Sequence, residues 1–314
     1  MVKTRLHLVK QIAALLVGVA MAVSVTAQVK IAKSNNGVLV TEKGNNVLFY
    51  QVAQKSIDGK YERCNYIHPL WGIDGTILTE DFPADHLHQR GIFWAWHQIL
   101  INGKSVGDGW AIIDYKQEVT KTETESLKDG SAVLKTEVNW LSDKWKKAGK
   151  EIPYLKENTT ITIHPKRENY RKIDFEIHLL ALTGNLKIGG ADNVKGYSGF
   201  SARISLPADV KFSGPNGAVI PENTAVESPG FVNISGAYGK GGTPAGLVLV
   251  DNSENPMYPQ KWILRKEKSM QNPVFPGREV FPVSTKEPLV LKYSLLVYTG
   301  KLTSGEIENI LEEQ

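Results

Sequence analysis

The chain has 314 residues, a formal net charge of +4 and one cysteine, Cys64. A single cysteine excludes an intramolecular disulfide, and a small buried side chain is its expected role rather than a nucleophile. Part of the positive charge comes from Lys3, Arg5 and Lys10 at the start of the chain, and no basic stripe interleaved with aromatic residues follows. The sequence therefore indicates no nucleic-acid partner.

The first residues predict a secretory signal peptide. Basic residues precede an apolar run over residues 12–25, and compact residues follow it before Gln28. This order of charged, apolar and small segments is typical of a cleaved signal. The apolar run is shorter than the ~20 residues that a membrane-spanning helix needs. We therefore expect residues 28–314 to form one secreted or periplasmic domain, with no membrane anchor after cleavage.

Signal peptidase is expected to cut after Ala27, so that Gln28 becomes the first residue of the exported protein. The reason is the small side chain at the end of the apolar run, where the peptidase needs one. Intact-mass measurement of the exported protein checks this prediction. A retained segment 1–27 would contradict it.

Most of the remaining chain has strand character. In the segment 170–182, Ile173, Phe175, Ile177 and Leu179 fall on one face and mostly charged residues fall on the other. This period of two is typical of a strand with one buried face. Segments with strand character, in chain order, are 91–101, 131–140, 155–164, 170–182, 199–206, 246–250 and 289–298.

Only one segment predicts a helix convincingly. In residues 304–311, Ser304 is the predicted N-cap, and Ile307, Ile310 and Leu311 share one face. Many strands and few helices predict an all-β fold. At this length, the expected architecture is one large antiparallel β-sandwich that ends in a short C-terminal helix.

The segment 80–97 holds the densest group of side chains that can do chemistry. It contains three of the seven histidines, together with three acids and an arginine. A proline and the absence of apolar periodicity predict a loop over residues 80–89, anchored by the apolar strand that follows. Function is therefore expected here. In the strand, Trp94 and Trp96 share one face and are predicted to pack in the core, as is His97.

His86 and His88 are the predicted catalytic residues. Imidazole titrates near neutral pH, so both side chains can transfer protons. Side chains two apart on an extended segment project the same way, so a divalent metal bound by His86 and His88 is an alternative. Because no clear spacing supplies further ligands, no cofactor is predicted. In a third interpretation, both rings only bond to nearby carbonyls.

Other polar and aromatic residues are candidates for substrate contact. Arg90 is predicted to hold negative charge on a substrate, with an internal salt bridge to a nearby aspartate as the alternative. Tyr197 lies beside glycines that allow close backbone approach, and Arg203 lies in the next strand. An ordinary strand remains the alternative for these positions. The predicted substrate contacts are Asp81, Asp85, Tyr197, Arg203, Trp262 and Arg265.

Four motifs carry a resemblance to a known family. They are Tyr-Ile-His-Pro-Leu-Trp-Gly at 66–72, Asp-Phe-Pro-Ala-Asp-His-Leu-His-Gln-Arg-Gly at 81–91, Gly-Tyr-Ser-Gly-Phe at 196–200 and Asp-Asn-Ser-Glu-Asn-Pro at 251–256. The chain resembles the secreted bacterial proteins labelled "methane oxygenase PmoA". That label implies a metal-dependent oxidoreductase. The sequence departs from the family pattern at Leu87, where proline is more frequent, and at Gln89, where histidine is frequent.

A second resemblance is shorter. Phe82-Pro83, His86 or His88, Arg90 and Trp94 occur in the same order as in the galactose-mutarotase-like epimerases. Those proteins are large antiparallel supersandwiches that bind sugars on a concave sheet. The resemblance implies the same fold and a carbohydrate ligand for this chain.

These observations together predict a secreted carbohydrate-active protein. It would be an epimerase, lyase or hydrolase in which His86 and His88 transfer protons beside Arg90. Aromatic faces would stack on the sugar, and the polar candidates would bond to its hydroxyls. The alternatives are a non-catalytic glycan-binding module and a metal-dependent oxidoreductase.

Overall fold

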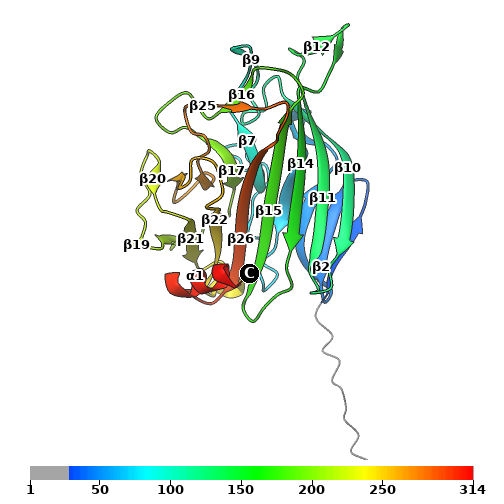
Figure 1. Cartoon of the computed structure of the whole chain (residues 1–314). Coiled ribbons are helices and arrows are strands. Elements are labelled where there is room, and N and C mark those ends of the chain that lie inside the picture. The colour runs from blue at the N-terminus through cyan, green and yellow to red at the C-terminus, as the bar shows by residue number, and fades with distance from the viewer. Residues whose placement is uncertain (1–27, 314) are drawn as a thin grey trace, which may run out of the picture.

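The computed structural model describes residues 28–313, so the predicted signal peptide lies outside the described residues. Two antiparallel sheets enclose the main apolar core (Figure 1). The nine-stranded sheet contains, in spatial order, β10 (Lys116–Ser126), β11 (Ala132–Leu141), β14 (Leu155–Ile163), β15 (Tyr170–Ala181), β26 (Leu289–Thr299), β22 (Ala245–Asp251), β21 (Phe231–Gly236), β18 (Lys211–Gly214) and β19 (Gly217–Ala218). The six-stranded sheet contains β1 (Val29–Lys33), β2 (Gly37–Glu42), β3 (Asn45–Gln51), β6 (Tyr66–Leu70), β7 (Ile92–Trp96) and β17 (Ser198–Ala202).

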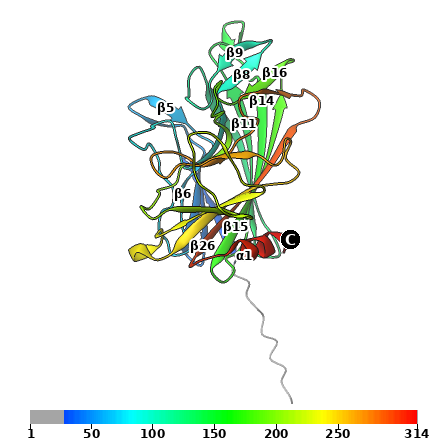
Figure 2. The ribbon, with the colours of Figure 1, turned by 90° about the vertical axis from the view of Figure 1, so that its left-hand side faces the viewer.

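Smaller sheets and hairpins extend this sandwich. In both views, β9 and β16 lie at one end of the molecule and the C-terminal helix lies at the other (Figures 1 and 2). The small elements are β25 (Val280–Val283), β16 (Leu186–Gly189), β8 (Gln98–Ile101) and β9 (Lys104–Gly107) in one sheet, β20 (Val226–Glu227), β23 (Lys261–Ile263) and β24 (Asn272–Pro273) in another, the hairpins β4 (Lys55–Ile57) with β5 (Lys60–Arg63) and β12 (Lys146–Lys147) with β13 (Lys150–Glu151), and a 3-10 turn, η1 (Lys240–Gly242).

The sandwich forms because each sheet has one apolar face. In β15, buried and half-buried residues alternate along the whole strand. Phe175 from β15 meets Trp94 from β7 with ring centroids 6.3 Å apart, so side chains of the two sheets interdigitate. The predictions of an all-β antiparallel sandwich and of core positions for Trp94 and Trp96 are confirmed.

A buried carboxyl group links the two sheets. Glu157 of β14 accepts hydrogen bonds from the indole Nε1 atoms of Trp94 and Trp140, each at 2.9 Å, and from Asn65 Nδ2 at 2.8 Å. Burial raises the pKa of Glu157, although these donors oppose the shift. Trp94 belongs to the six-stranded sheet and Glu157 to the nine-stranded sheet, so their bond helps to fix the stacking of the sheets.

Two local predictions need correction. The segment 91–101 is not one strand: it breaks at His97 into β7 and β8, which belong to different sheets. The helix α1 (Ser304–Glu312) has Thr303 rather than Ser304 as its N-cap, because Thr303 and Glu306 bond reciprocally in a capping box. In the described part of the chain, no helix has the length and apolar character needed to cross a membrane.

The outer face of the six-stranded sheet, which points away from the main core, carries a second apolar cluster. Tyr66 from β6 and Phe93 and Ala95 from β7 belong to this cluster and not to the main core. They alternate with inward residues such as Ile67 and Trp94. The loop after β6 contacts this cluster through bonds from Tyr66 to Asp81 and from Arg90 to Tyr66, and Tyr197, just before β17, packs against it.

Candidate functional site

The loop between β6 and β7 is held closed at its base. Asp81 and Arg90 form an isolated antiparallel bridge, and two turns lie between them. Gly91, next to the bridge, has φ +46°, and a Cβ there would lie 1.9 Å from the carbonyl oxygen of Ile67. Only glycine tolerates that approach. The loop therefore leaves β6 and returns to β7 in a fixed geometry.

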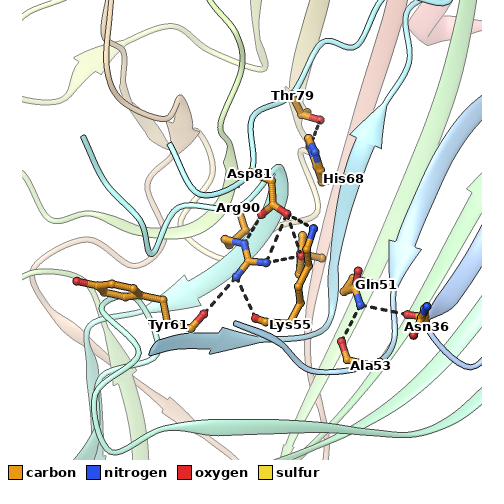
Figure 3. Close-up of polar contacts among 10 residues, drawn as sticks. Asn36, Gln51, Ala53, Lys55, Tyr61, His68, Thr79, Asp81 and Arg90 are labelled. Atoms are coloured by element: carbon orange, nitrogen blue, oxygen red, sulfur yellow. Dashed lines mark hydrogen bonds and ion pairs between the residues drawn. The ribbon is translucent and has the colours of Figure 1, made fainter. Parts of the chain in front are cut away.

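Arg90 lies inside the loop and is bonded on every side (Figure 3). Its Nε and Nη2 donate to the carboxylate of Asp81, Nη2 donates to the Tyr66 hydroxyl at 2.5 Å, and Nη1 donates to the carbonyl oxygens of Tyr61 and Lys55. The guanidinium carbon also lies 3.5 Å from the ring centroid of Phe82. These contacts tie the loop to the β4–β5 hairpin.

These contacts correct the role predicted for Arg90. Its side chain has no exposed surface and its nitrogens are bonded within the protein, so it positions the loop instead of contacting a substrate. Asp81 likewise pairs with Arg90 and with Lys55 Nζ at 2.7 Å. Burial raises the pKa of Asp81, but the bonds and charges of Arg90 and Lys55 outweigh burial and hold it below its usual value.

Arg203 fixes the other side of the loop. Arg203 directly follows β17. Its guanidinium donates to Glu80 at 2.6 Å, to both carboxylate oxygens of Asp85 at 2.7 and 2.9 Å, and to Gln89 at 2.8 Å. Burial raises the pKa of Asp85, but the hydrogen bonds from Arg203 and His86 and the charge of Arg203 have a larger, opposite effect. The pKa of Asp85 is therefore lowered to about 2. Arg203 is therefore also a positioning residue, which corrects the prediction of substrate contact. Asp85 stays partly exposed.

The structure brings His86 and His88 together. Their ring centroids lie 5.7 Å apart, with the rings nearly perpendicular. His86 is exposed, and its Nδ1 lies 2.7 Å from Asp85 Oδ2. His88 is half-buried. Burial, together with the smaller effects of nearby charges such as Arg63, lowers the pKa of His88 to about 4. At neutral pH His88 is therefore uncharged and able to accept a proton.

Acidification is expected to weaken the fold through His88. Its pKa of about 4 lies below the ordinary value of 6.5, so between these values the unfolded chain binds the proton more readily. The stability contributed by neutral His88 is present above pH 6.5 and is lost as the pH falls toward 4. Urea unfolding of wild type and His88→Gln at about pH 7 and about pH 5 checks this. If wild type and His88→Gln lost the same free energy of unfolding between the two pH values, the prediction would be contradicted.

His97 and Asp108 join the site although the sequence did not predict it. His97 Nδ1 lies 2.8 Å from Asp108 Oδ2, and both side chains keep about a quarter of their surface exposed, at 24% and 26%. The prediction that His97 is a core residue is therefore wrong. Both groups act on the pKa of His88, which places them in its electrostatic surroundings. The break between β7 and β8, which no periodicity signalled, exposes His97.

Aromatic rings continue from His97 along the outer face. Trp110 stacks on His97 with centroids 5.4 Å apart and lies 5.8 Å from the ring of Tyr197. Tyr197 is half-buried, and Arg265 Nη2 donates to its hydroxyl at 3.2 Å. A hollow of about 570 Å³ begins beside Tyr197, lined in part by Lys195 and Gly196. Tyr197 and Arg265 are thus together at one border of the site.

Trp262 does not belong to this surface. Its side chain has no exposed area, and its indole Nε1 donates to the carbonyl oxygen of Ser228 at 2.6 Å. It packs in the main core, so the prediction that it stacks on a sugar is wrong. Arg265 bonds mainly to the carbonyl oxygens of Glu222 and Asn223 and holds that loop against Tyr197.

His68 is a further histidine that sequence reasoning did not select. Its Nδ1 lies 3.0 Å from Thr79 Oγ1, which accepts a bond from the backbone N–H of Leu70 (Figure 3). Burial lowers the pKa of His68, while the charge of Asp81 opposes the shift. The alternation in β6 puts His68 on the outer face, with Tyr66.

Purified protein is expected to hold no stoichiometric zinc, copper or iron. Within residues 28–313, no three side chains of His, Cys, Asp or Glu are grouped so that they could hold a metal ion. Structural metal sites normally take four protein ligands, and His86 and His88 supply two. Elemental analysis of protein prepared without chelator checks this. Stoichiometric metal that disappears in His88→Ala would overturn the prediction.

Comparison with known proteins places the chain beside one family. A model described as a family of unknown function (DUF6807) matches residues 37–312. The match runs from β2 to α1 and includes the loop with His86 and His88 and the segment with Asp108 and Trp110. No curated protein matches the chain.

Proposed function

The chain belongs to the DUF6807 family, and from its site we propose that it binds a saccharide on the outer face of the six-stranded sheet and transfers protons on it. We propose that it does so as a secreted or periplasmic protein. The reaction class that fits is an epimerase, lyase or hydrolase of a saccharide. The following paragraphs give the support for this proposal.

The observation that carries the proposal is the group of three histidines with two carboxylate partners. His88 is neutral at neutral pH, so it would accept a proton from the sugar. His86 and His97 each bond through Nδ1 to an aspartate, Asp85 and Asp108, which orients the ring. Either His86 or His97 would donate a proton back to the sugar. Proton transfer in both directions needs this combination of an acceptor and an oriented donor.

The neighbouring aromatic surface supports a saccharide as the ligand. Tyr197 is half-buried and packs on the buried ring of Trp110, which in turn stacks on His97. A hollow lined in part by Lys195 and Gly196 lies next to Tyr197. Flat aromatic rings stack on the apolar faces of sugar rings, while polar groups at the rim bond to hydroxyls. Lys195, whose Nζ lies 5.7 Å from the centroid of the Tyr197 ring, is such a polar group.

The test is a saccharide screen followed by product analysis. Binding of a panel of neutral and acidic oligosaccharides is measured first by calorimetry, and every saccharide that binds is then incubated with the protein and examined by NMR. A new epimer, an unsaturated sugar or a shortened chain supports the proposal. Binding without any product would leave a glycan-binding module, and the absence of binding to any saccharide would reject the proposal.

A further inference from the structure

The hollow beside Tyr197 has the dimensions of a small-molecule site. Its volume is about 570 Å³, within the range of ~300–1,000 Å³ that such sites occupy. Its walls come from residues within the segments 193–196, 257–261 and 274–278, together with Ala225. These segments lie just before β17, at the start of β23 and after β24, so the fold brings them together from distant parts of the chain.

Unlike Arg90 and Arg203, the hollow is open to solvent. Val194 and Met257 on its rim are 75% and 55% exposed, and Tyr258, next to Met257, is 37% exposed. These are three of the seven large apolar side chains that are exposed within residues 28–313. Exposed apolar side chains that gather at one place, surrounded by polar groups, mark a binding surface. A ligand can therefore reach this hollow directly from solvent.

The floor of the hollow is apolar and held in place. Gly196, Val274 and Pro276 are buried residues of the lining, and they form this floor. The Ser198 hydroxyl donates to the carbonyl oxygen of Gly196 at 2.9 Å and accepts a bond from the backbone N–H of Gly277 at 3.3 Å. Ser198 thus holds two walls of the hollow together. A preformed hollow binds a ligand without the entropy cost of ordering loops.

The charged groups around the rim balance. The basic residues of the lining are Lys195, Lys261 and Arg278. Lys261 pairs with Glu227 at 3.5 Å. Arg278 pairs with Asp192 at 2.8 Å, and the charge of Glu279 also acts on Arg278. Three cations thus accompany three acids, so the rim does not select a charged ligand. It offers N–H donors above an apolar floor, and this combination fits the hydroxyls and the apolar face of a neutral sugar ring.

The hollow adjoins the candidate site at two points. Lys195 lines the hollow, and its Nζ lies 5.7 Å from the centroid of the half-buried Tyr197 ring. On the other side Gln98, the residue after His97, donates from Nε2 to the carbonyl oxygen of Arg278 at 2.9 Å. The hollow and the histidine group are therefore neighbouring parts of one surface.

One sugar ring does not occupy both parts. His86, His88 and His97 do not line the hollow. A ring that fills the hollow therefore leaves the histidines uncovered, and a ring held at the histidines leaves the hollow empty. A ligand that uses both parts of the surface has at least two linked sugar units.

We propose that the hollow is a second sugar subsite, so that the ligand is an oligosaccharide or the end of a polysaccharide. This inference rests on the proposed function and adds the size class of the substrate. One unit would lie at the histidines for proton transfer, and the following units would pass Tyr197 into the hollow. Contacts made there, away from the reacting atoms, would favour chains over monosaccharides.

The experiment measures affinity against chain length. Calorimetry is done with neutral cello-, xylo- and manno-oligosaccharides, from the monosaccharide to the hexasaccharide, and with the matching series of any further saccharide that the screen identifies. In a series that binds, wild type is expected to bind the tetrasaccharide about 10- to 100-fold more tightly than the monosaccharide. One further packed ring with one or two hydrogen bonds would give this difference.

Two rim variants assign the length dependence to the hollow. Met257→Asp and Val194→Asp place a carboxylate in the apolar lining, where ligand binding would strip it of water. Met257 has φ +63°, a conformation that aspartate adopts more readily than most residues, so this change adds no backbone strain. Each variant should remove most of the preference for the tetrasaccharide over the monosaccharide.

A matched control separates the hollow from general charge and from folding. Leu182→Asp introduces the same carboxylate at an apolar residue that is 49% exposed and does not line the hollow. This variant should keep the preference for the tetrasaccharide. Circular dichroism verifies the fold of all three variants.

Each other outcome overturns the inference. Equal affinity of wild type for the monosaccharide and the tetrasaccharide would mean that the ligand does not extend into the hollow, and the proposed function would survive. A preference that persists in both rim variants would place the further units elsewhere. Loss of the preference in Leu182→Asp as well would show that general charge sets it. Binding of no saccharide at all would reject both the inference and the proposed function.

Discussion

Replacing His88 by alanine is expected to lower turnover of a saccharide substrate by about 10²–10⁴-fold, the usual contribution of a positioned acid or base. His88 is uncharged at neutral pH because burial and the positive charges around it hold its pKa at about 4. Alanine removes this proton acceptor. The same range is expected for His86→Ala, because the ring held by Asp85 would be lost as a proton donor.

The fold should survive both substitutions, since His86 is exposed and His88 is half-buried in a loop held by other residues. Sugar binding should persist, because the half-buried ring of Tyr197 remains in place. His178→Ala is the matched control: His178 is a partly exposed histidine of β15 that bonds to Glu176. Equal turnover in wild type and both loop variants would remove proton transfer and favour the glycan-binding module.

The sandwich itself was predictable because strand periodicity is a local signal. The segments 155–164, 170–182 and 289–298 differ by at most one residue at each end from β14, β15 and β26. Each of these strands is central in the nine-stranded sheet, so one face is buried along its whole length and the alternation is complete. The fold class therefore followed from the sequence alone.

The break at His97 was not predictable from the same signal. Residues 92–96 and 99–101, on either side of His97 and Gln98, are all apolar, so the segment 91–101 has no clear change of period. The break arises from tertiary structure: β7 pairs with β17, and β8 pairs with β16 in another sheet. The helix cap, by contrast, could be predicted: Glu306 follows Thr303 at the spacing of a capping box, whereas Ile307 stands at that spacing from Ser304.

The roles of the arginines also could not be predicted from the sequence. Arg203 bonds to Glu80, which lies 123 positions away in the chain, and no sequence pattern predicts a pair at that separation. The sequence did offer an internal salt bridge as the alternative for Arg90, and the structure has that bridge with Asp81. Partnership is a property of the fold, so residue type alone could not assign these roles.

Asp81→Ala is expected to be the most destabilising change in the site, with a loss of about 3–5 kcal/mol in the free energy of unfolding. Asp81 is the only carboxylate that pairs with Arg90 in the described part of the chain, and Arg90 has no exposed surface. Alanine would leave a buried guanidinium without compensation and would also free Lys55. Urea denaturation followed by tryptophan fluorescence measures the loss.

Two comparisons make this result decisive. Arg90→Met should cost less, because Lys55 still pairs with Asp81 at 2.7 Å and an apolar chain can pack against the rings of Phe82 and Tyr66. Asp192→Ala removes an exposed pair and should change stability by no more than about 0.5 kcal/mol. A cost of Asp81→Ala similar to that of Asp192→Ala would show that the Arg90 pair does not hold the loop. Loss of turnover in a fully folded Arg90→Met, with the loop intact, would return Arg90 to a direct role in the reaction.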